Sequence, residues 1–270
     1  MKSLESKITV ITGGASGIGR MLALQMASQG SRVVVWDINQ ELLSSLEREA
    51  AEKKVSIIGM ALDITDRKRV YACAQEVLSR VGPVDILVNN AGVVSGQTLL
   101  ETPDEKIEKT IQVNFLSNCW TVKAFLPSMI ERNTGHIVTI ASAAALIGVT
   151  GLADYSASKS AVYGFHESVR MELKKQRKKI ATTVVCPFFI DTGMFAGVQT
   201  RFPLLLPILR PEYAVRRINK AILAKKERLI MPRFVYSVFL LKLLPVWLMD
   251  VIADFFGITH AMDQFTGRRG

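Results

Sequence analysis

The stretch Lys7-Ile-Thr-Val-Ile-Thr-Gly-Gly-Ala-Ser-Gly-Ile-Gly19 decides the fold class. Its first half, residues 7–12, is a short β-branched run, which is typical of a buried strand. Residues 20–30 then read as a helix with a glycine at its end. Glycines permit a tight turn and a close approach of the backbone to a pyrophosphate, and the amino end of the helix faces the anion. Strand, glycine turn and helix in this order predict a nucleotide site; the alternative is a turn that only joins the two elements.

Strand-like and helix-like runs continue to alternate as far as about Met231. This alternation predicts an α/β fold, a single-domain Rossmann-type doubly wound parallel sheet with helices on both faces. The chain has 270 residues, of which 49% are hydrophobic, and this suffices for one large core. We expect an NAD-binding catalytic domain at residues 1–231, with a substrate lid within 193–226. An apolar and basic helical extension is expected at 232–270.

Asp37 ends the second predicted strand, eighteen residues after Gly19. An acidic residue near this position hydrogen-bonds the adenosine ribose and repels a 2′-phosphate. Ile38 follows, where a basic residue would welcome that phosphate. The pattern therefore favours NAD(H) over NADP(H), although Arg20 is a nearby cation that leaves NADP(H) open. The alternative for Asp37 is a loop carboxylate or a helix cap.

Tyr155 and Lys159 are spaced to share one helix face. A nearby positive charge favours phenolate, so we expect Lys159 to lower the tyrosine pKa toward working pH. A tyrosine tuned in this way can exchange a proton with an alcohol oxygen. Ser142 ends the apolar run 137–142, at the carboxyl end of a predicted buried strand, where open α/β sheets bind their ligands. Taken alone, the Tyr–Lys spacing also fits a solvated pair.

These motifs together resemble the short-chain dehydrogenase/reductase family over nearly the whole chain. The glycine turn, the segment Asn89-Asn-Ala-Gly92 and the Tyr155–Lys159 pair match that family in order and spacing. The resemblance implies a catalytic set of Asn114, Ser142, Tyr155 and Lys159. It implies cofactor contacts from Gly13, Ala15, Ser16, Gly17, Ile18, Gly19, Asp37, Ile38, Asp63, Ile64, Asn90, Ala91, Gly92, Tyr155, Lys159, Pro187, Ile190 and Thr192.

One position departs from the family pattern, which usually has Pro-Gly where this chain has Pro187-Phe188. The phenylalanine changes the local backbone freedom. It either forms an aromatic wall near the substrate or packs in the core.

Within the family, residues 34–39, 125–139 and 163–166 are similar to the retinol dehydrogenases and the lipid-droplet 17-beta-hydroxysteroid dehydrogenases. This likeness implies a lipophilic alcohol or ketone as substrate, with retinoid, steroid and long-chain compounds left open. The family resemblance also implies a homodimer or homotetramer.

The formal net charge is +10, and residues 201–270 contribute +7 of it. The same region carries apolar runs at 202–209 and 234–249. Lys242 and Pro245 interrupt the second run, so we do not predict a transmembrane helix. A basic, aromatic helix in the plane of the lipid headgroups fits better. The expected contacts are Phe234, Phe239, Trp247 and Phe255 as anchors, and Arg228, Arg233 and Lys242 as cations. Two alternatives stay open: this region covers a substrate pocket, or it forms a dimer interface.

Other functions receive less support. The three cysteines and three histidines lack metal-ligand spacing, so we expect no metal site and buried reduced thiols, hence a reducing compartment. The start of the chain has no secretory signal pattern, which predicts an intracellular, cytoplasmic location, with peripheral membrane association left open. The basic tail lacks a nucleic-acid reader motif, so no nucleic-acid partner is expected. A lipid-surface or scaffold protein with weak or no catalysis is the second hypothesis.

Overall fold

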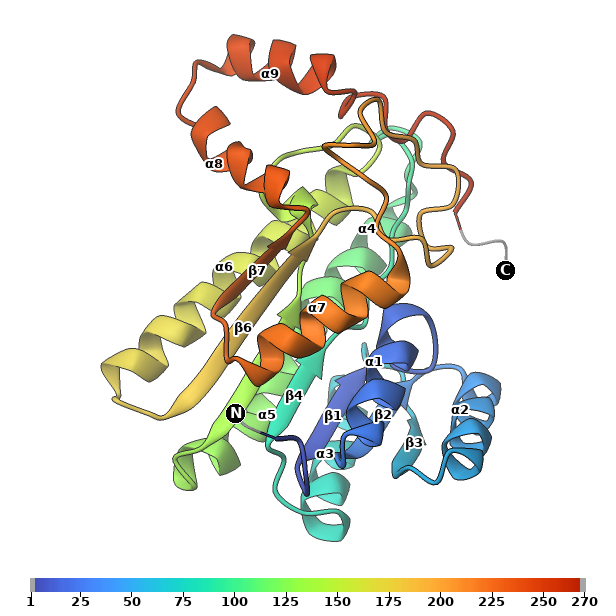
Figure 1. The fold of residues 1–270 in the computed structure, drawn as a ribbon, viewed down its shortest axis with the longest axis vertical. Coiled ribbons are helices and arrows are strands. Elements are labelled where there is room, and N and C mark those ends of the chain that lie inside the picture. Colours follow the sequence, from blue (N-terminus) through green and yellow to red (C-terminus); the bar gives the residue numbers. More distant parts are fainter. Residues whose placement is uncertain (1–2, 268–270) are drawn as a thin grey trace.

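The computed structural model of the chain describes residues 3–267. Its centre is a seven-stranded parallel sheet in the order β3-β2-β1-β4-β5-β6-β7 (Figure 1). The strand order reverses between β1 and β4, the kind of position where open α/β sheets bind ligands. The predicted fold class is thus confirmed. The strands are β1 (Ile8–Thr12), β2 (Arg32–Asp37), β3 (Ile57–Ala61), β4 (Ile86–Asn89), β5 (Gly135–Ile140), β6 (Ile180–Pro187) and β7 (Arg228–Met231).

Helices cover both faces of this sheet (Figure 1). Alternate residues of β2 enter two separate cores: Val33 and Val35 join one, and Val34 and Trp36 the other. All four are buried, which explains why the strands of this parallel sheet read as continuous apolar runs. The first core contains residues of α1 (Gly17–Ser28), α2 (Gln40–Glu52) and α7 (Pro211–Leu223), and the second contains residues of α3 (Arg67–Arg80), α5 (Ser117–Glu131) and α6 (Ala153–Lys175).

The two helices predicted within residues 104–132 are joined without a loop. Helix α4 (Asp104–Ile111) passes through a π-helical turn, η1 (Gln112–Leu116), directly into α5. A π-turn carries one extra residue per turn and is frequent at functional sites. Here it contains Asn114, one of the predicted catalytic residues.

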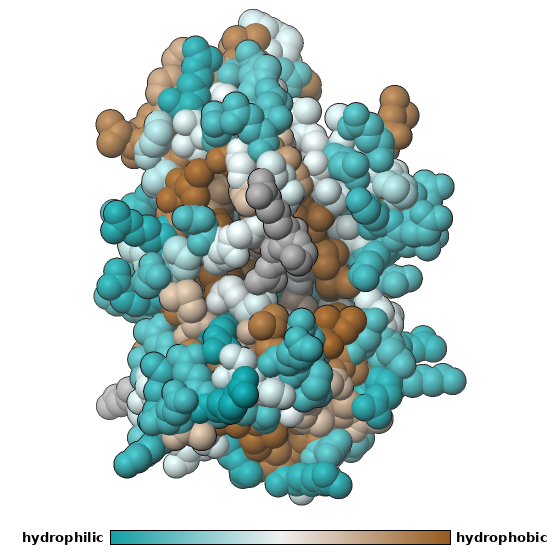
Figure 2. Space-filling view, turned by 90° about the vertical axis from the view of Figure 1, so that its right-hand side faces the viewer, coloured by the Kyte–Doolittle hydropathy of each residue, from teal (hydrophilic) through white to brown (hydrophobic). Residues whose placement is uncertain are grey.

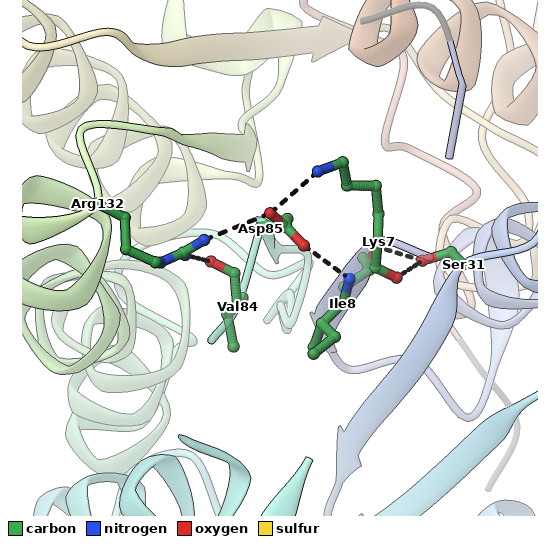
Figure 3. Close-up of polar contacts among 7 residues, drawn as sticks. Lys7, Ile8, Ser31, Val84, Asp85 and Arg132 are labelled. Atoms are coloured by element: carbon green, nitrogen blue, oxygen red, sulfur yellow. Dashed lines mark hydrogen bonds and ion pairs between the residues drawn. The ribbon is translucent and has the colours of Figure 1, made fainter. Parts of the chain in front are cut away.

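Asp85 ties the amino ends of two strands to a helix (Figure 3). Its carboxylate accepts hydrogen bonds from the Ile8 backbone N–H at 3.1 Å and from Lys7 Nζ at 3.3 Å. Arg132, which follows α5, lies 3.5 Å from the same carboxylate and donates to the Val84 carbonyl oxygen. This network fixes β1, β4 and α5 at the edge of the sheet opposite the carboxyl ends of the strands.

The segment after β7 lies beyond the carboxyl ends of the strands (Figure 1). It consists of a 3-10 turn, η3 (Arg233–Ser237), and the helices α8 (Val238–Leu241) and α9 (Val246–Phe255). Pro245 stands between the two helices, so the run expected to form one helix is broken. Figure 2 shows apolar side chains at the top of the molecule, the end where α8 and α9 lie in Figure 1. No helix within residues 3–267 has the length and apolar content needed to cross a bilayer.

Two of the residues expected to contact lipid also have partners within the protein. The Phe234 ring packs against the Phe256 ring, with centroids 5.2 Å apart. Arg228 pairs with Glu167 at 2.8 Å and lies over the ring of Tyr163. Lipid contact through Phe234 and Arg228 therefore stays a prediction, with intramolecular partners already contacting the ring and the charge. Phe239, Trp247, Phe255, Arg233 and Lys242 are exposed.

The cysteines are free thiols. Cys73 and Cys186 are buried as expected, whereas Cys119 is partly exposed, so the expectation of a buried thiol is wrong for Cys119. His136 and His166 are buried and hydrogen-bond to threonine hydroxyls. Among the described residues, no cluster of histidine, cysteine and acidic side chains could hold a metal ion.

Candidate active site

A cleft of about 350 Å³ at the carboxyl edge of the sheet gathers most of the predicted site residues. It is lined by Ser142, Tyr155 and Lys159 and by every predicted cofactor residue except Ala15. Asn114 lies behind the wall and is fully buried. The structure therefore brings together residues as far apart in the sequence as Gly13 and Thr192.

The glycine turn forms the floor of the cleft. Gly13 and Gly17 have φ angles of +62° and +54°, a conformation that side chains with a Cβ rarely adopt. A Cβ on Gly19 would lie 2.3 Å from the Gly13 carbonyl oxygen. The Asn90 amide donates to the carbonyl oxygens of Thr12 and Gly13 at 3.0 and 2.8 Å, which fixes the turn against β4. This Cβ-free cradle at the amino end of α1 fits a dinucleotide pyrophosphate.

Asp37 is held in place at the end of β2. Its two carboxylate oxygens accept hydrogen bonds from the backbone N–H groups of Ala15 (3.0 Å) and Asn39 (3.1 Å). Ala15 thus braces Asp37 from behind and does not line the cleft. Arg20, the cation that left NADP(H) open, pairs with Glu49 at 2.5 Å. Its charge is accordingly compensated inside the protein.

Tyr155 and Lys159 lie in the first two turns of α6, and both are nearly fully buried. Lys159 Nζ lies 5.6 Å from the centre of the Tyr155 ring and donates to the Ile140 carbonyl oxygen at 3.0 Å. Ser142 precedes a 3-10 turn, η2 (Ala143–Ala145), and its Oγ accepts from the Ala144 N–H at 3.1 Å. The end of β5 and the start of α6 therefore present three polar groups to one side of the cleft.

Burial is the main cause of the pKa shifts of Tyr155 and Lys159. Burial raises the pKa of Tyr155 to about 12, against a smaller opposing effect of its hydrogen bond with Ser142. Burial also lowers the pKa of Lys159 to about 8. The expectation that Lys159 brings the Tyr155 pKa down toward neutrality is therefore wrong for this structure. The loss of hydration outweighs the Ser142 hydrogen bond at Tyr155 and the coulombic effect of Cys186 at Lys159.

Asn114 connects the loop after β4 to the Tyr155 helix. Its Oδ1 accepts from the Val93 N–H at 2.8 Å, and its Nδ2 donates to Ser158 Oγ at 3.0 Å. The Ser158 hydroxyl donates in turn to the Tyr155 carbonyl oxygen at 2.7 Å. Sequence reasoning missed Ser158, although its position directly before Lys159 on the buried side of the helix was a usable signal.

Aromatic rings form a further part of the cleft wall. Phe188 and Phe189 have centroids 4.6 Å apart, and Phe195 lies 5.1 Å from Phe189 and 5.7 Å from the Tyr155 ring. Phe188 lines the cleft, and its backbone is not in the left-handed region that would favour glycine. Sequence reasoning also missed other lining residues, among them Val93, Lys109, Val113, Ala143, Met194 and Phe195.

Comparison with known proteins agrees with this geometry. Residues 7–201 match the family described as short chain dehydrogenase. The chain belongs to the short-chain dehydrogenase family. It is 49% identical over 273 aligned residues to epidermal retinol dehydrogenase 2 of Mus musculus, covering 99% of this chain and 88% of the relative. It is 40% identical to retinol dehydrogenase 10 of Homo sapiens, covering 99% of this chain and 87% of that protein.

Solved structures of this family have the same fold. A short-chain dehydrogenase/reductase from Burkholderia phymatum in complex with NAD superposes with a TM-score of 0.81 at 27% identity, covering 90% of this chain and 95% of that one. A metagenomic short-chain oxidoreductase in complex with NADP gives 0.71 at 28% identity, covering 85% and 98%. This short-chain dehydrogenase is thus an oxidoreductase that acts on CH–OH groups with a nicotinamide dinucleotide.

Proposed function

We propose that the chain is an NAD(H)-dependent dehydrogenase that interconverts a lipophilic alcohol and its carbonyl compound. The observation that carries this proposal is the juxtaposition of Tyr155, Ser142 and Lys159 with a glycine cradle in one cleft. The aromatic wall at Phe188 and Phe195 suits an apolar substrate better than a polar one. Relatives named as retinol dehydrogenases favour a retinoid, and steroid or long-chain alcohols are the other members of the class.

The choice of NAD(H) over NADP(H) rests on Asp37. Its carboxylate lies in the cleft, held by two backbone N–H groups, where it would accept from ribose hydroxyls and repel a 2′-phosphate. Arg20 does not offset this charge, because its guanidinium is paired with Glu49. Lys109 and Lys159 also line the cleft, and Lys159 lies beside Tyr155 at the catalytic end.

The residues of the cleft divide the chemistry among them. The nicotinamide, when bound, supplies the hydride acceptor or donor. Ser142 and Tyr155 would hold the substrate oxygen between their hydroxyls. Tyr155 gives its proton to a carbonyl oxygen during reduction and accepts the proton of the alcohol during oxidation. Lys159 stabilises the phenolate that forms as this proton leaves and orients the nicotinamide ribose.

Asn114 has a supporting role in this scheme. Its contacts with Val93 and Ser158 hold the π-helical turn against α6. We propose that Asn114, within this turn, holds a water molecule that links Lys159 to solvent in a proton relay.

We also propose that the surface formed by α8 and α9 lies on a lipid bilayer. Leu243, Val246, Trp247 and Val251 on this surface are each 60% or more exposed. Exposed apolar side chains next to basic residues are typical of interfacial helices. Arg233 and Lys242 supply the basic charge. Such contact would bring the cleft close to the phase in which its substrate dissolves.

The decisive experiment compares Tyr155→Phe with Tyr163→Phe. Both changes remove one phenol oxygen from α6, but only Tyr155 lines the cleft. We expect Tyr155→Phe to abolish retinol oxidation with NAD while NADH binding, followed by fluorescence, stays intact. Tyr163→Phe should keep its activity. Near-normal turnover by Tyr155→Phe would refute the assigned proton donor.

The rival function is a lipid-surface or scaffold protein on the same fold. It would bind vesicles yet oxidise no member of a panel of lipophilic alcohols with NAD or NADP, run with and without liposomes. Turnover of any of these alcohols that depends on Tyr155 excludes this rival.

A further inference from the structure

A second cavity of about 50 Å³ lies beside the catalytic cleft, and its exposed lining is entirely apolar. Its inner walls come from η2, from the loop after η2 and from Phe188 and Leu206 in the segment after β6. Its outer walls come from η3, α8 and the α9 region. Ala143 and Phe188 line both this cavity and the catalytic cleft. The two spaces are therefore separated by a single layer of side chains.

The partition lies close to the reacting groups. Ala143 directly follows Ser142, whose hydroxyl is assigned to the substrate oxygen. The Phe188 N–H donates to the Met231 carbonyl oxygen at 2.8 Å, which fixes its backbone against β7. Its half-buried ring packs on Phe189. The Phe188 side chain can thus change rotamer while its backbone stays in place.

We propose that this second cavity binds the distal hydrocarbon part of the substrate and that Phe188 decides how much of it enters. The proposal rests on the proposed function and adds a subsite to it. An apolar cavity does not hold water stably but is a favourable site for hydrocarbon. The occupant is therefore an alkyl or isoprenoid chain whose oxygen-bearing end lies at Ser142 and Tyr155.

The outer wall of the cavity connects this subsite to the exposed surface. Ala253 and Phe256 of the α9 region line the cavity, whereas Trp247 and Val251 of the same helix are exposed. A helix whose outer face lies on lipid would then present its inner face to the substrate chain. The exposed surface and the cavity thus form one apolar path toward the catalytic cleft.

The test places the same bulky side chain on either side of α9. Ala253→Phe fills the cavity, and Val251→Phe places the same side chain on the exposed face as the matched control. Initial rates with NAD are measured for butanol, hexanol, octanol and decanol. Each methylene excluded from an apolar site weakens binding by about fourfold. We expect Ala253→Phe to lower the ratio of kcat/KM for decanol over butanol by about tenfold, and Val251→Phe to leave this ratio unchanged.

Phe188→Ala gives the opposite change, because it joins the two spaces. We expect it to raise the decanol-to-butanol ratio, and the double variant Phe188→Ala, Ala253→Phe to lose this gain. Equal effects on short and long alcohols, or an effect of Val251→Phe as large as that of Ala253→Phe, would overturn the subsite.

Retinol binding without dinucleotide separates this inference from the proposed function. We expect Ala253→Phe to weaken binding, followed by retinol fluorescence, by about tenfold, with Val251→Phe unchanged. If the wild-type chain turned over no alcohol but showed this difference, the function would fail and the subsite would stand. Unaltered retinol binding in Ala253→Phe would overturn the subsite, whatever the activity.

Discussion

Tyr155 and Lys159 are buried within the same two turns of α6, and their pKa values move in opposite directions. With a pKa of about 12, the phenol of Tyr155 is protonated at neutral pH and is ready to donate. With a pKa of about 8, Lys159 loses its charge as the pH rises above that value. The resting pair is therefore arranged for proton donation to a carbonyl oxygen.

This arrangement predicts how the two directions of the reaction depend on pH. We expect kcat/KM for retinal reduction to be level from about pH 6 to about pH 7.5, because the phenol stays protonated. Retinol oxidation should rise over the same range, since it needs the deprotonated form. Initial rates in both directions with NAD(H) measure this. A reduction rate that falls through about pH 7, together with an oxidation rate that levels off above the same pH, would mean a lowered Tyr155 pKa.

At the scale of the element, α8, α9 and the turn between them carry exposed apolar side chains. Leu243 is 80% exposed and Trp247 is 68% exposed. Pro245 separates the two short helices, so each can lie flat without forming one long rod. A patch of this kind is typical of a surface that contacts lipid or another protein.

Serine at these two positions tests lipid contact. We expect Leu243→Ser with Trp247→Ser to reduce flotation of the protein with anionic vesicles by about tenfold or more, because two buried apolar side chains would be lost from the interface. Leu42→Ser on α2, which is 38% exposed on a different element, is the control and should float normally. Equal flotation of the double variant and the wild type would contradict lipid contact through this surface.

At the scale of the whole molecule, the two ends of the strands have different roles: one carries the cleft and the other is held together by a polar network. The carboxyl ends of the strands carry the cleft, and the amino ends are joined by Asp85 (Figure 3). Asp85 is mostly buried and accepts hydrogen bonds from β1 and from Arg132 after α5. Assembly into a homodimer or homotetramer stays a prediction, which the mass from light scattering would test.

The fastening role of Asp85 predicts a loss of stability when it is removed. We expect Asp85→Ala to lower the free energy of unfolding by about 2 kcal/mol, because buried donors lose their acceptor. Glu76→Ala, which breaks the exposed pair with Arg80, should cost less than about 0.5 kcal/mol. Urea unfolding followed by tryptophan fluorescence measures both. Equal losses of unfolding free energy in the two variants would show that Asp85 stabilises the fold no more than an exposed ion pair does.

Local patterns predicted most of the fold and of the site. The β-branched run before Gly13 and the spacing of Tyr155 and Lys159 are short-range features that the backbone geometry of strands and helices converts directly into position. They predicted the parallel sheet and the glycine turn, whereas most other residues of the cleft, among them Asp63, Asn90 and Thr192, were expected from the family resemblance.

Only the tertiary structure decided the rest, because burial and pairing depend on contacts between distant segments. It buried Tyr155 and thereby raised its pKa, paired Arg20 with Glu49 and Arg228 with Glu167, and turned Phe234 inward against Phe256. It also placed Phe188 between two apolar spaces. A side chain's neighbours across the chain set its hydration and its charge, and no local pattern in the sequence contains them.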